Sequence, residues 1–238
     1  MNSQIRHHRV SNFSIRKLFR TDWFIIGGLL FLCLVPTLAG AMRVAELASG
    51  AEVTTENARF FEAPFPILSH IISVTIYSIV GAFQFAPNFR RRHMRWHRQM
   101  GWVLAVSGIV AAWSGIWMTF YYSKPEGASF LLDMIRLFFG VLMLFSIFWA
   151  MVEIRRRDFK AHEAWMMRGY AIGLGAGTQV FTHLPWFIFF SSEPPGDLPG
   201  AIMMAGGWLI NLLFVEWIIW KRPFHPTRSQ SKQQQGIT

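Results

Sequence analysis

The chain has 238 residues, of which 53% are hydrophobic and only 15% charged, whereas average soluble domains carry about 25% charged residues. This composition excludes intrinsic disorder, which requires low hydrophobicity. The single cysteine, Cys33, excludes a disulfide framework, an iron–sulfur cluster and a c-type haem attachment site. The net charge of +10 raises the question of nucleic-acid binding, which the positions of the basic residues decide.

Six stretches are long and apolar enough to cross a membrane, for which about 18 consecutive apolar residues are needed. In chain order they are residues 23–42, 66–86, 101–122, 131–152, 164–190 and 201–220. Because a helix satisfies its own backbone hydrogen bonds in lipid, we predict an all-α integral membrane bundle of six transmembrane helices. The fifth stretch is overlong and contains Pro185, so its helix is expected to end near Leu184.

This assignment divides the chain into three parts. A cytoplasmic basic N-terminal segment, 1–21, precedes a six-helix membrane domain, 22–222, whose core is helices 2–5 at about 66–190. The tail at 223–238 is rich in Ser and Gln and is expected to be disordered. A secretory signal is the alternative interpretation of the first stretch, but its apolar run of about 18 residues exceeds the usual 7–15.

The basic residues predict the orientation of the bundle. Most of the 23 lysines and arginines precede helix 1, follow helix 6, or connect helices 2 to 3 and 4 to 5. The opposite connections carry only Arg43, Arg59 and Lys124, and Asp133 is spaced to pair with Arg136 nearby in helix 4. By the positive-inside rule both termini are cytoplasmic. The net charge then reflects topology and attraction to anionic lipid headgroups, with no nucleic-acid partner.

Helix 2 carries a line of small and polar residues on one face. At about 100° per residue, its five members fall within an arc of about 80°. They are His70, Ser73, Tyr77, Gly81 and Gln84. Because polar groups facing lipid are costly, this face is predicted to point into the bundle. It either forms interhelical hydrogen bonds with Gly81 as a close-packing point, or lines a cavity for a cofactor or substrate.

Helix 5 carries glycines at four-residue spacing, Gly169, Gly173 and Gly177. Such a ridge lets a neighbouring helix approach closely, and it equally makes room for a flat macrocycle.

The histidines fall near the two faces of the membrane. His70 and His183 lie near the outer ends of their helices, whereas His93, His97 and His162 flank cytoplasmic ends. The helix from His162 to His183 is about 31 Å long, roughly the hydrocarbon thickness. Haem iron in electron carriers takes two axial side chains, and neutral imidazole is a good iron ligand. Two layers therefore fit two b-type haems, although interfacial histidines also contact lipid headgroups.

In this hypothesis the iron ligands of an outer haem are His70 and His183, and an inner site uses His162 with His93 or His97. The residues expected to line or tune the cavity are Tyr77, Gln84 and Arg168. Arg168 would hold a haem propionate or a quinone oxygen, or else extend to the lipid headgroups.

Several strings carry a resemblance to a known family. They are His70, Gly-Ala-Phe-Gln-Phe at 81–85, Arg-His at 92–93, His-Arg-Gln-Met-Gly-Trp at 97–102 and Ala-His-Glu-Ala-Trp-Met-Met-Arg-Gly-Tyr-Ala at 161–171. Over about residues 66–185 the chain resembles the bacterial multi-pass membrane family called domain of unknown function 2306. The resemblance implies a helical protein of the bacterial inner membrane with no settled activity. Gln179 stands where the family pattern has a basic residue, after Thr178.

The histidine placement is also similar to that of two-haem membrane cytochromes and ferric-reductase-like domains, by architecture alone. We therefore expect a multi-pass inner-membrane protein that carries electrons on b-type haem, with a quinone or another redox partner. The alternative is a non-catalytic membrane protein without a cofactor, either a small-molecule transporter or a structural or assembly partner. The sequence leaves open whether the protein is an enzyme.

Overall fold

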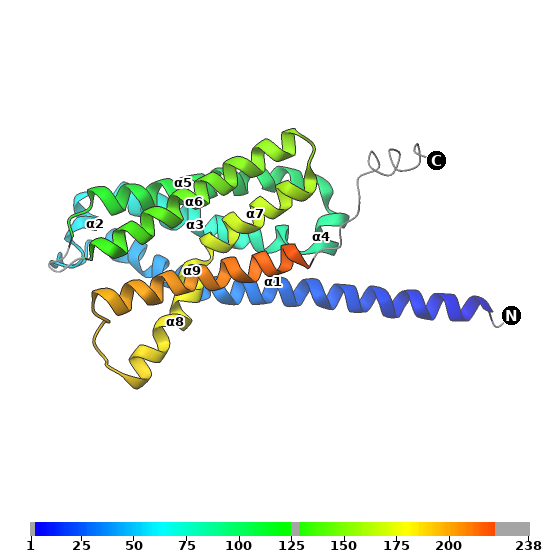
Figure 1. The fold of residues 1–238 in the computed structure, drawn as a ribbon, viewed down its shortest axis with the longest axis horizontal. Coiled ribbons are helices and arrows are strands. Elements are labelled where there is room, and N and C mark those ends of the chain that lie inside the picture. The colour runs from blue at the N-terminus through cyan, green and yellow to red at the C-terminus, as the bar shows by residue number, and fades with distance from the viewer. Residues whose placement is uncertain (1–2, 125–128, 222–238) are drawn as a thin grey trace, which may run out of the picture.

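The computed structural model describes the backbone of residues 3–124 and 129–221 and the side chains of residues 22–124 and 129–221. The regular structure of these residues is entirely helical, which confirms the all-α prediction (Figure 1). In chain order the helices are α1 (Ser3–Ser49), α2 (Ala58–Glu62), α3 (Pro64–Gln84), α4 (Pro87–Arg92), α5 (Met94–Tyr121), α6 (Phe130–Arg155), α7 (Phe159–Gly173), α8 (Gly175–Phe189) and α9 (Asp197–Trp220). The tail at 223–238 lies outside the described residues.

Five of the helices are long and apolar enough to cross a membrane: the part of α1 from Asp22 to Ser49, α3, α5, α6 and α9. With 21 residues, α3 is about 32 Å long, close to the hydrocarbon thickness of about 30 Å. These five helices correspond to the first four and the sixth predicted stretches. The sequence predicts the presence of these spans better than the residues at which they begin, since α5 begins at Met94 rather than at residue 101.

The fifth predicted stretch forms two helices of 15 residues each, α7 and α8, which change direction at Leu174 (Figure 1). The expected end near Leu184 is wrong, because α8 continues through Pro185 to Phe189. A proline inside a helix removes one backbone hydrogen bond and its ring crowds the carbonyl four residues earlier, and membrane helices tolerate this cost. The break falls instead between Gly173 and Gly175, the residue type that favours a helix interior least after proline.

Side chains of α9 satisfy the backbone at this break. Trp208 Nε1 donates to Ile172 O at 3.1 Å, and Asn211 Nδ2 donates to Ala171 O at 3.0 Å. The Trp208 indole also occupies the space that a side chain at position 175 would need. Irregular backbone at membrane depth requires such partners, so α9 stabilises the bend between α7 and α8.

Helices α3, α5, α6 and α7 surround Tyr77, which is completely buried. A Cβ on Gly108 of α5 would lie 2.5 Å from Tyr77 Cε2, and a Cβ on Gly173 of α7 would lie 2.6 Å from Cε1. The phenol ring thus fills the space left by these glycines. The two remaining candidate spans, α1 and α9, flank this core. Helix α1 packs against α3 and α8, and α9 packs against α6, α7 and α8.

The predicted inward face of α3 is confirmed. Ser73, Tyr77, Gly81 and Gln84 are all buried inside the bundle. Large apolar side chains on the outer surfaces are exposed instead, for example Phe138 at 61%. Exposed apolar area of this extent is unfavourable in water and favourable in lipid, which supports a membrane-embedded bundle.

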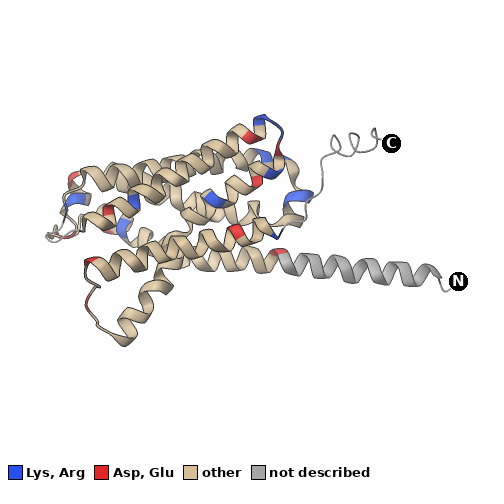
Figure 2. Cartoon of the chain, viewed as in Figure 1, with Lys and Arg blue, Asp and Glu red and all other residues tan. Residues whose placement is uncertain are grey.

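The bundle has two distinct ends. We call one the α4 end, because it carries α4 together with the connection between α6 and α7, the start of α1 and the end of α9 (Figure 1). The other is the α2 end, with α2 and the connection between α5 and α6. Figure 2 shows basic residues at the α4 end and others near the α2 end. At the α4 end, the basic residues of α4, of the last position of α6 and of the connection after it are Arg90, Arg91, Arg92, Arg155, Arg156 and Arg157.

Candidate functional site

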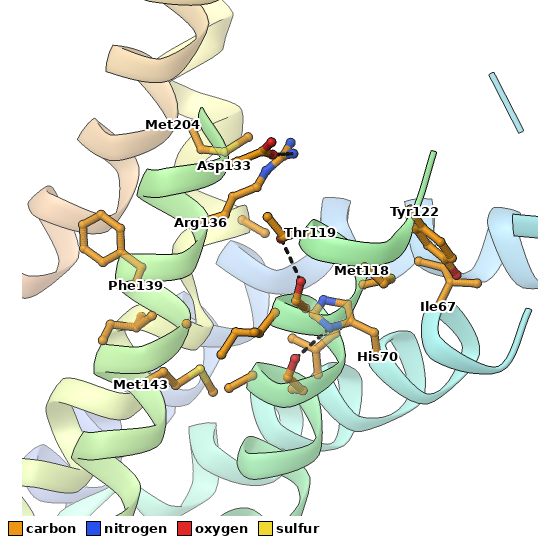
Figure 3. A pocket seen from close by; sticks show the side chains of 18 of the residues that line it. Ile67, His70, Met118, Thr119, Tyr122, Asp133, Arg136, Phe139, Met143 and Met204 are labelled. Atoms are coloured by element: carbon orange, nitrogen blue, oxygen red, sulfur yellow. Dashed lines mark hydrogen bonds and ion pairs between the residues drawn. The ribbon is translucent and has the colours of Figure 1, made fainter. Parts of the chain in front are cut away.

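A cavity of about 420 Å³ lies near the α2 end, between α3, α5, α6, α9 and the bend between α7 and α8. We call it the α2-end cavity. Its wall includes His70 from the polar face of α3, together with Gly115 of α5 and Gly140 of α6. Figure 3 shows His70 and Thr119 on one side of this space and Arg136 with Asp133 on the other.

His70 is held by α5. Its Nδ1 lies 2.9 Å from Ala111 O and 3.1 Å from Ser114 Oγ. The Ser114 hydroxyl itself donates to Val110 O at 2.6 Å, so its oxygen can accept a bond from the imidazole. Because a carbonyl only accepts, Nδ1 must carry the proton, and the neutral ring then has its electron pair on Nε2. This tautomer makes His70 an acceptor or a metal ligand through Nε2.

The inner wall of the cavity is apolar. Phe139 and Met143 of α6, Trp208 of α9 and Ile172 at the bend all line it. The Phe139 and Trp208 rings stack with centroids 4.6 Å apart, which fixes both side chains. These groups suit an apolar portion of a ligand.

The mouth of the cavity is charged. Asp133 of α6 is only 9% exposed at its side chain and forms an ion pair with Lys124. Arg136 Nη1 lies 3.7 Å from the other oxygen of Asp133, so the predicted pairing within helix 4 is confirmed. Arg59 of α2 completes the mouth and donates from Nη1 to Ser123 O at 3.5 Å. Among the described residues, three cations and one carboxylate therefore line the mouth, and two of the cations pair with that carboxylate.

Tyr122 closes the cavity beside α2. Its hydroxyl donates to Ala63 O at 2.7 Å, and its ring meets Phe60 edge-on with centroids 5.5 Å apart. Burial raises the pKa of this phenol, so it remains a hydrogen-bond donor across the physiological range. These contacts fasten α2, and with it Arg59, over the end of α5.

The bend between α7 and α8 also reaches the cavity. Gly173, Ala176 and Gln179 line it, and Gln179 Nε2 donates to Met204 O of α9 at 3.1 Å. Gln179 therefore ties α8 to α9. The bend places polar backbone and a glycine at the wall of the cavity.

His183 is placed differently from His70. Its Nδ1 lies 2.8 Å from Gln179 O of its own helix and 3.4 Å from Thr182 Oγ1. It is not among the residues that line the α2-end cavity. Of the two ligands expected for an outer haem, only His70 therefore faces this space.

Tyr77 and Gln84 lie deeper along α3, away from the cavity. The Tyr77 hydroxyl is buried without a hydrogen-bond partner. Gln84 Nε2 donates to His97 O at 3.2 Å, whereas its Oε1 is buried and unpartnered. Buried polar atoms of this kind are rare in folded proteins and mark places where water or another polar group would be accommodated.

At the α4 end, His97 lies in the first turn of α5 and His162 in the first turn of α7. His162 Nδ1 is held 2.8 Å from Ala150 O of α6. Arg90 and Glu163 form an ion pair of 2.8 Å. His97 and His162, two of the histidines expected to serve an inner site, thus lie at the same end of the bundle.

The side chains of His93 and Arg168 have other partners. His93 is exposed between α4 and α5, where its ring packs against Phe89 with centroids 4.7 Å apart. Arg168 of α7 forms a two-point ion pair with Glu216 of α9, from Nε at 2.5 Å and from Nη2 at 2.9 Å. Its guanidinium also lies 4.6 Å from the centre of the Trp165 ring. Arg168 therefore fastens α7 to α9.

The glycine ridge serves packing in the described structure. Gly173 accommodates Tyr77, and a side chain at Gly177 would overlap the backbone of Leu32 in α1. Gly81 likewise leaves room for the Tyr170 ring, whose hydroxyl donates to Ser78 O at 2.7 Å. Close approach is what small residues provide in membrane bundles.

Within the described residues, no group of three or more histidine, cysteine, aspartate or glutamate side chains is arranged to hold a metal ion. Two residues of the cavity mouth, Arg59 and Lys124, were not singled out as site residues by sequence reasoning. The available signal was their charge, because basic residues are few on the side opposite to the main basic connections.

These features define a multi-pass helical membrane protein with a cavity near one end of its bundle. The chain belongs to the family described as "Predicted membrane protein (DUF2306)", whose model matches residues 67–219. The match confirms the resemblance and extends it past residue 185, through most of α9. Neither the curated proteins nor the solved structures contain a match to this chain.

Proposed function

We propose that this protein binds a small amphiphilic molecule from the bilayer in the α2-end cavity. The observation that carries the proposal is the combination of an apolar inner wall, the imidazole of His70 and a charged mouth in one space. Ligand sites are typically concave, mostly apolar and equipped with a few polar groups, with volumes of about 300–1,000 Å³. The volume of about 420 Å³ falls within this range.

The broken helix supports the same proposal. In membrane transporters, discontinuous helices line the substrate site, where irregular backbone faces the cavity. Here the bend at Leu174 separates Gly173 from Ala176, and both of these residues line the cavity. This arrangement supports the small-molecule transporter, one of the alternatives expected from the sequence.

Photolabelling tests this proposal. The probe is a long-chain primary alcohol with a diazirine in its chain, and crosslinks are mapped by mass spectrometry. We expect labelling of Phe139 and Met143, which line the cavity, in excess of Phe138 on the outer surface. Labelling of the outer surface alone would reject cavity binding.

Two variants provide the matched comparison. Ala176→Phe adds a ring at an exposed residue of the cavity wall and should lower cavity labelling about tenfold, equivalent to about 1.4 kcal/mol. Leu213→Phe adds bulk to an outward position of α9 that is 68% exposed and should leave the labelling unchanged. The melting temperatures of both variants in detergent establish that they fold.

Haem binding and electron transport are the second candidate function. The geometry of His70 favours this second function. Its Nδ1 bonds to a backbone carbonyl, as in most metal-bound histidines, and Nε2 is left as the ligating atom. His183 does not line the same space, so ligation by His70 alone is the form that this cavity favours.

An absorption spectrum tests the haem proposal. Protein purified from haem-replete cells should show a reduced-minus-oxidised Soret and α-band difference, and His70→Ala should diminish it. His93→Ala is the comparison, since His93 is exposed at the other end of the bundle. A colourless preparation would eliminate this second function.

We also propose that the α4 end faces the cytoplasm of a bacterial inner membrane, because basic residues concentrate there. Cys33 is buried and is the single cysteine of the chain, so a Cys33→Ser background permits site-specific labelling. An impermeant maleimide should label Val53→Cys in intact cells, and should label Arg91→Cys only after permeabilisation. The reverse pattern would invert the orientation.

A further inference from the structure

We infer that the ligand of the α2-end cavity is an anionic amphiphile, with one apolar chain and a carboxylate or phosphate head group. This inference rests on the proposed function and specifies its ligand class. The head group would lie at the mouth among Arg59, Lys124 and Arg136, and the chain would lie against Phe139 and Trp208.

The charge at the mouth is unbalanced. Among the described residues that line the cavity, Arg59, Lys124 and Arg136 are the cations and Asp133 is the one carboxylate. Lys124 and Arg136 both pair with Asp133, one at each carboxylate oxygen. One negative charge against three positive charges leaves two in excess. An anionic head group would balance this excess in a partly desolvated site, where a charge needs a partner.

Arg59 has a hydrogen-bond donor without a partner. Its Nε is buried without a hydrogen-bond partner, and Nη1 makes a long bond of 3.5 Å to Ser123 O. The guanidinium lies 4.8 Å from the centre of the Phe60 ring, which holds its plane in place. A guanidinium presents five N–H donors in a fixed fork that matches carboxylate and phosphate oxygens. The unpartnered Nε is the donor that such an oxygen would satisfy.

Arg59, Lys124 and Arg136 line the cavity, whereas a fourth cation of the α2 end, Arg43, does not. Arg43 also lies at the α2 end, but it pairs with Glu46, which accepts a further bond from Asn57 Nδ2 at 2.7 Å. Neither Arg43 nor Glu46 lines the cavity. Arg136 lies inside the α6 span, where an ionisable side chain is costly and usually serves a site.

The test compares three diazirine probes that share one alkyl chain and differ in head group: an alcohol, a carboxylate and a phosphate monoester. With the full-length protein at about pH 8, the anionic probes should label Phe139 and Met143 about tenfold more efficiently than the alcohol, equivalent to about 1.4 kcal/mol. Preference for the carboxylate over the phosphate, or the reverse, identifies the head group.

Substitutions at the mouth should remove this preference. Arg59→Gln and Arg136→Gln should each lower the ratio of anionic to alcohol labelling towards one, and Arg59→Lys should lower it less, because it keeps the charge and loses the fork. Arg43→Gln is the matched control and should keep the full ratio. In Arg136→Gln, Asp133 retains Lys124 as a partner, so the change does not leave a lone carboxylate.

The outcomes separate this inference from the proposed function. Equal labelling of the cavity by all three probes, or a preference that survives both glutamine substitutions, would overturn the anionic head group and leave cavity binding intact. Labelling of the cavity by none of the probes would overturn the proposed function as well.

Discussion

The polar face of α3 has two halves with different surroundings. Around Tyr77 and Gly81 the neighbouring helices leave no space, and aromatic rings occupy the positions of missing side chains. Around His70 the same face lines the α2-end cavity, and a Cβ on the facing Gly115 would lie 3.4 Å from the imidazole. One helical periodicity thus produces a packed half and a hollow half. The difference comes from the residues on the facing helices.

Paired glycine substitutions give the largest expected difference between the two halves. Gly81→Ala would overlap the Tyr170 ring, and overpacking of this kind costs about 1–3 kcal/mol. Gly115→Ala would meet His70 at an ordinary contact distance and gains helix propensity of up to about 1 kcal/mol. The free energy of unfolding, measured by denaturation in mixed micelles, should therefore fall for Gly81→Ala and hold or rise for Gly115→Ala.

Gly101→Ala serves as the control, since nothing lies within 4 Å of a Cβ at that position of α5. This variant measures the gain in helix propensity from glycine to alanine where the added methyl group contacts no neighbour. Equal stability of Gly81→Ala and Gly101→Ala would contradict the packed half of the comparison.

The sequence predicts the inward face of α3 because lipid penalises every exposed polar group, whatever lies on the other side. The same penalty keeps the spans apolar, so hydropathy predicts where they lie. Helices α3, α6 and α9 accordingly begin within a few residues of the expected positions. Neither the polar pattern of a helix nor its hydropathy predicts whether an inward side chain meets protein or empty space. Tyr77 and His70 occupy equivalent positions in the pattern and have different surroundings for this reason.

The bend and the cavity mouth depend on contacts between distant segments. The break at Leu174 requires Trp208 and Asn211 of α9 to satisfy freed carbonyls, which hydropathy does not encode. Arg59 reaches the mouth because Tyr122 fastens α2 across the end of α5. Both features arise from tertiary packing, whereas the sequence pattern reports periodicity within one helix.

The bend between α7 and α8 provides a second test of the difference between the two halves, because it borders both the packed core and the cavity. Trp208→Phe keeps an aromatic ring against Phe139 but removes the donor to Ile172 O. Interhelical hydrogen bonds in membrane proteins contribute about 0.6 kcal/mol on average, with a maximum of about 1.7. We expect a loss of about 1 kcal/mol in the free energy of unfolding.

Trp217→Phe is the control, since that residue is exposed on the same helix. A stability of Trp208→Phe equal to that of Trp217→Phe would show that the Leu174 N–H, which also bonds Ile172 O, satisfies this carbonyl without the indole.

The smallest expected effect concerns the Tyr77 hydroxyl, which is buried without a partner in the packed half. Removing an unsatisfied buried group relieves a desolvation penalty, so Tyr77→Phe should leave the free energy of unfolding unchanged or raise it by up to about 1 kcal/mol. Tyr170→Phe is the matched control, because it deletes a hydroxyl that donates to Ser78 O at 2.7 Å, and should lower stability by about 1 kcal/mol. Equal losses in the two variants would mean that the Tyr77 hydroxyl has a partner in the membrane. Water or a ligand extending from the α2-end cavity would be that partner, and the two halves of the α3 face would then form one continuous polar path.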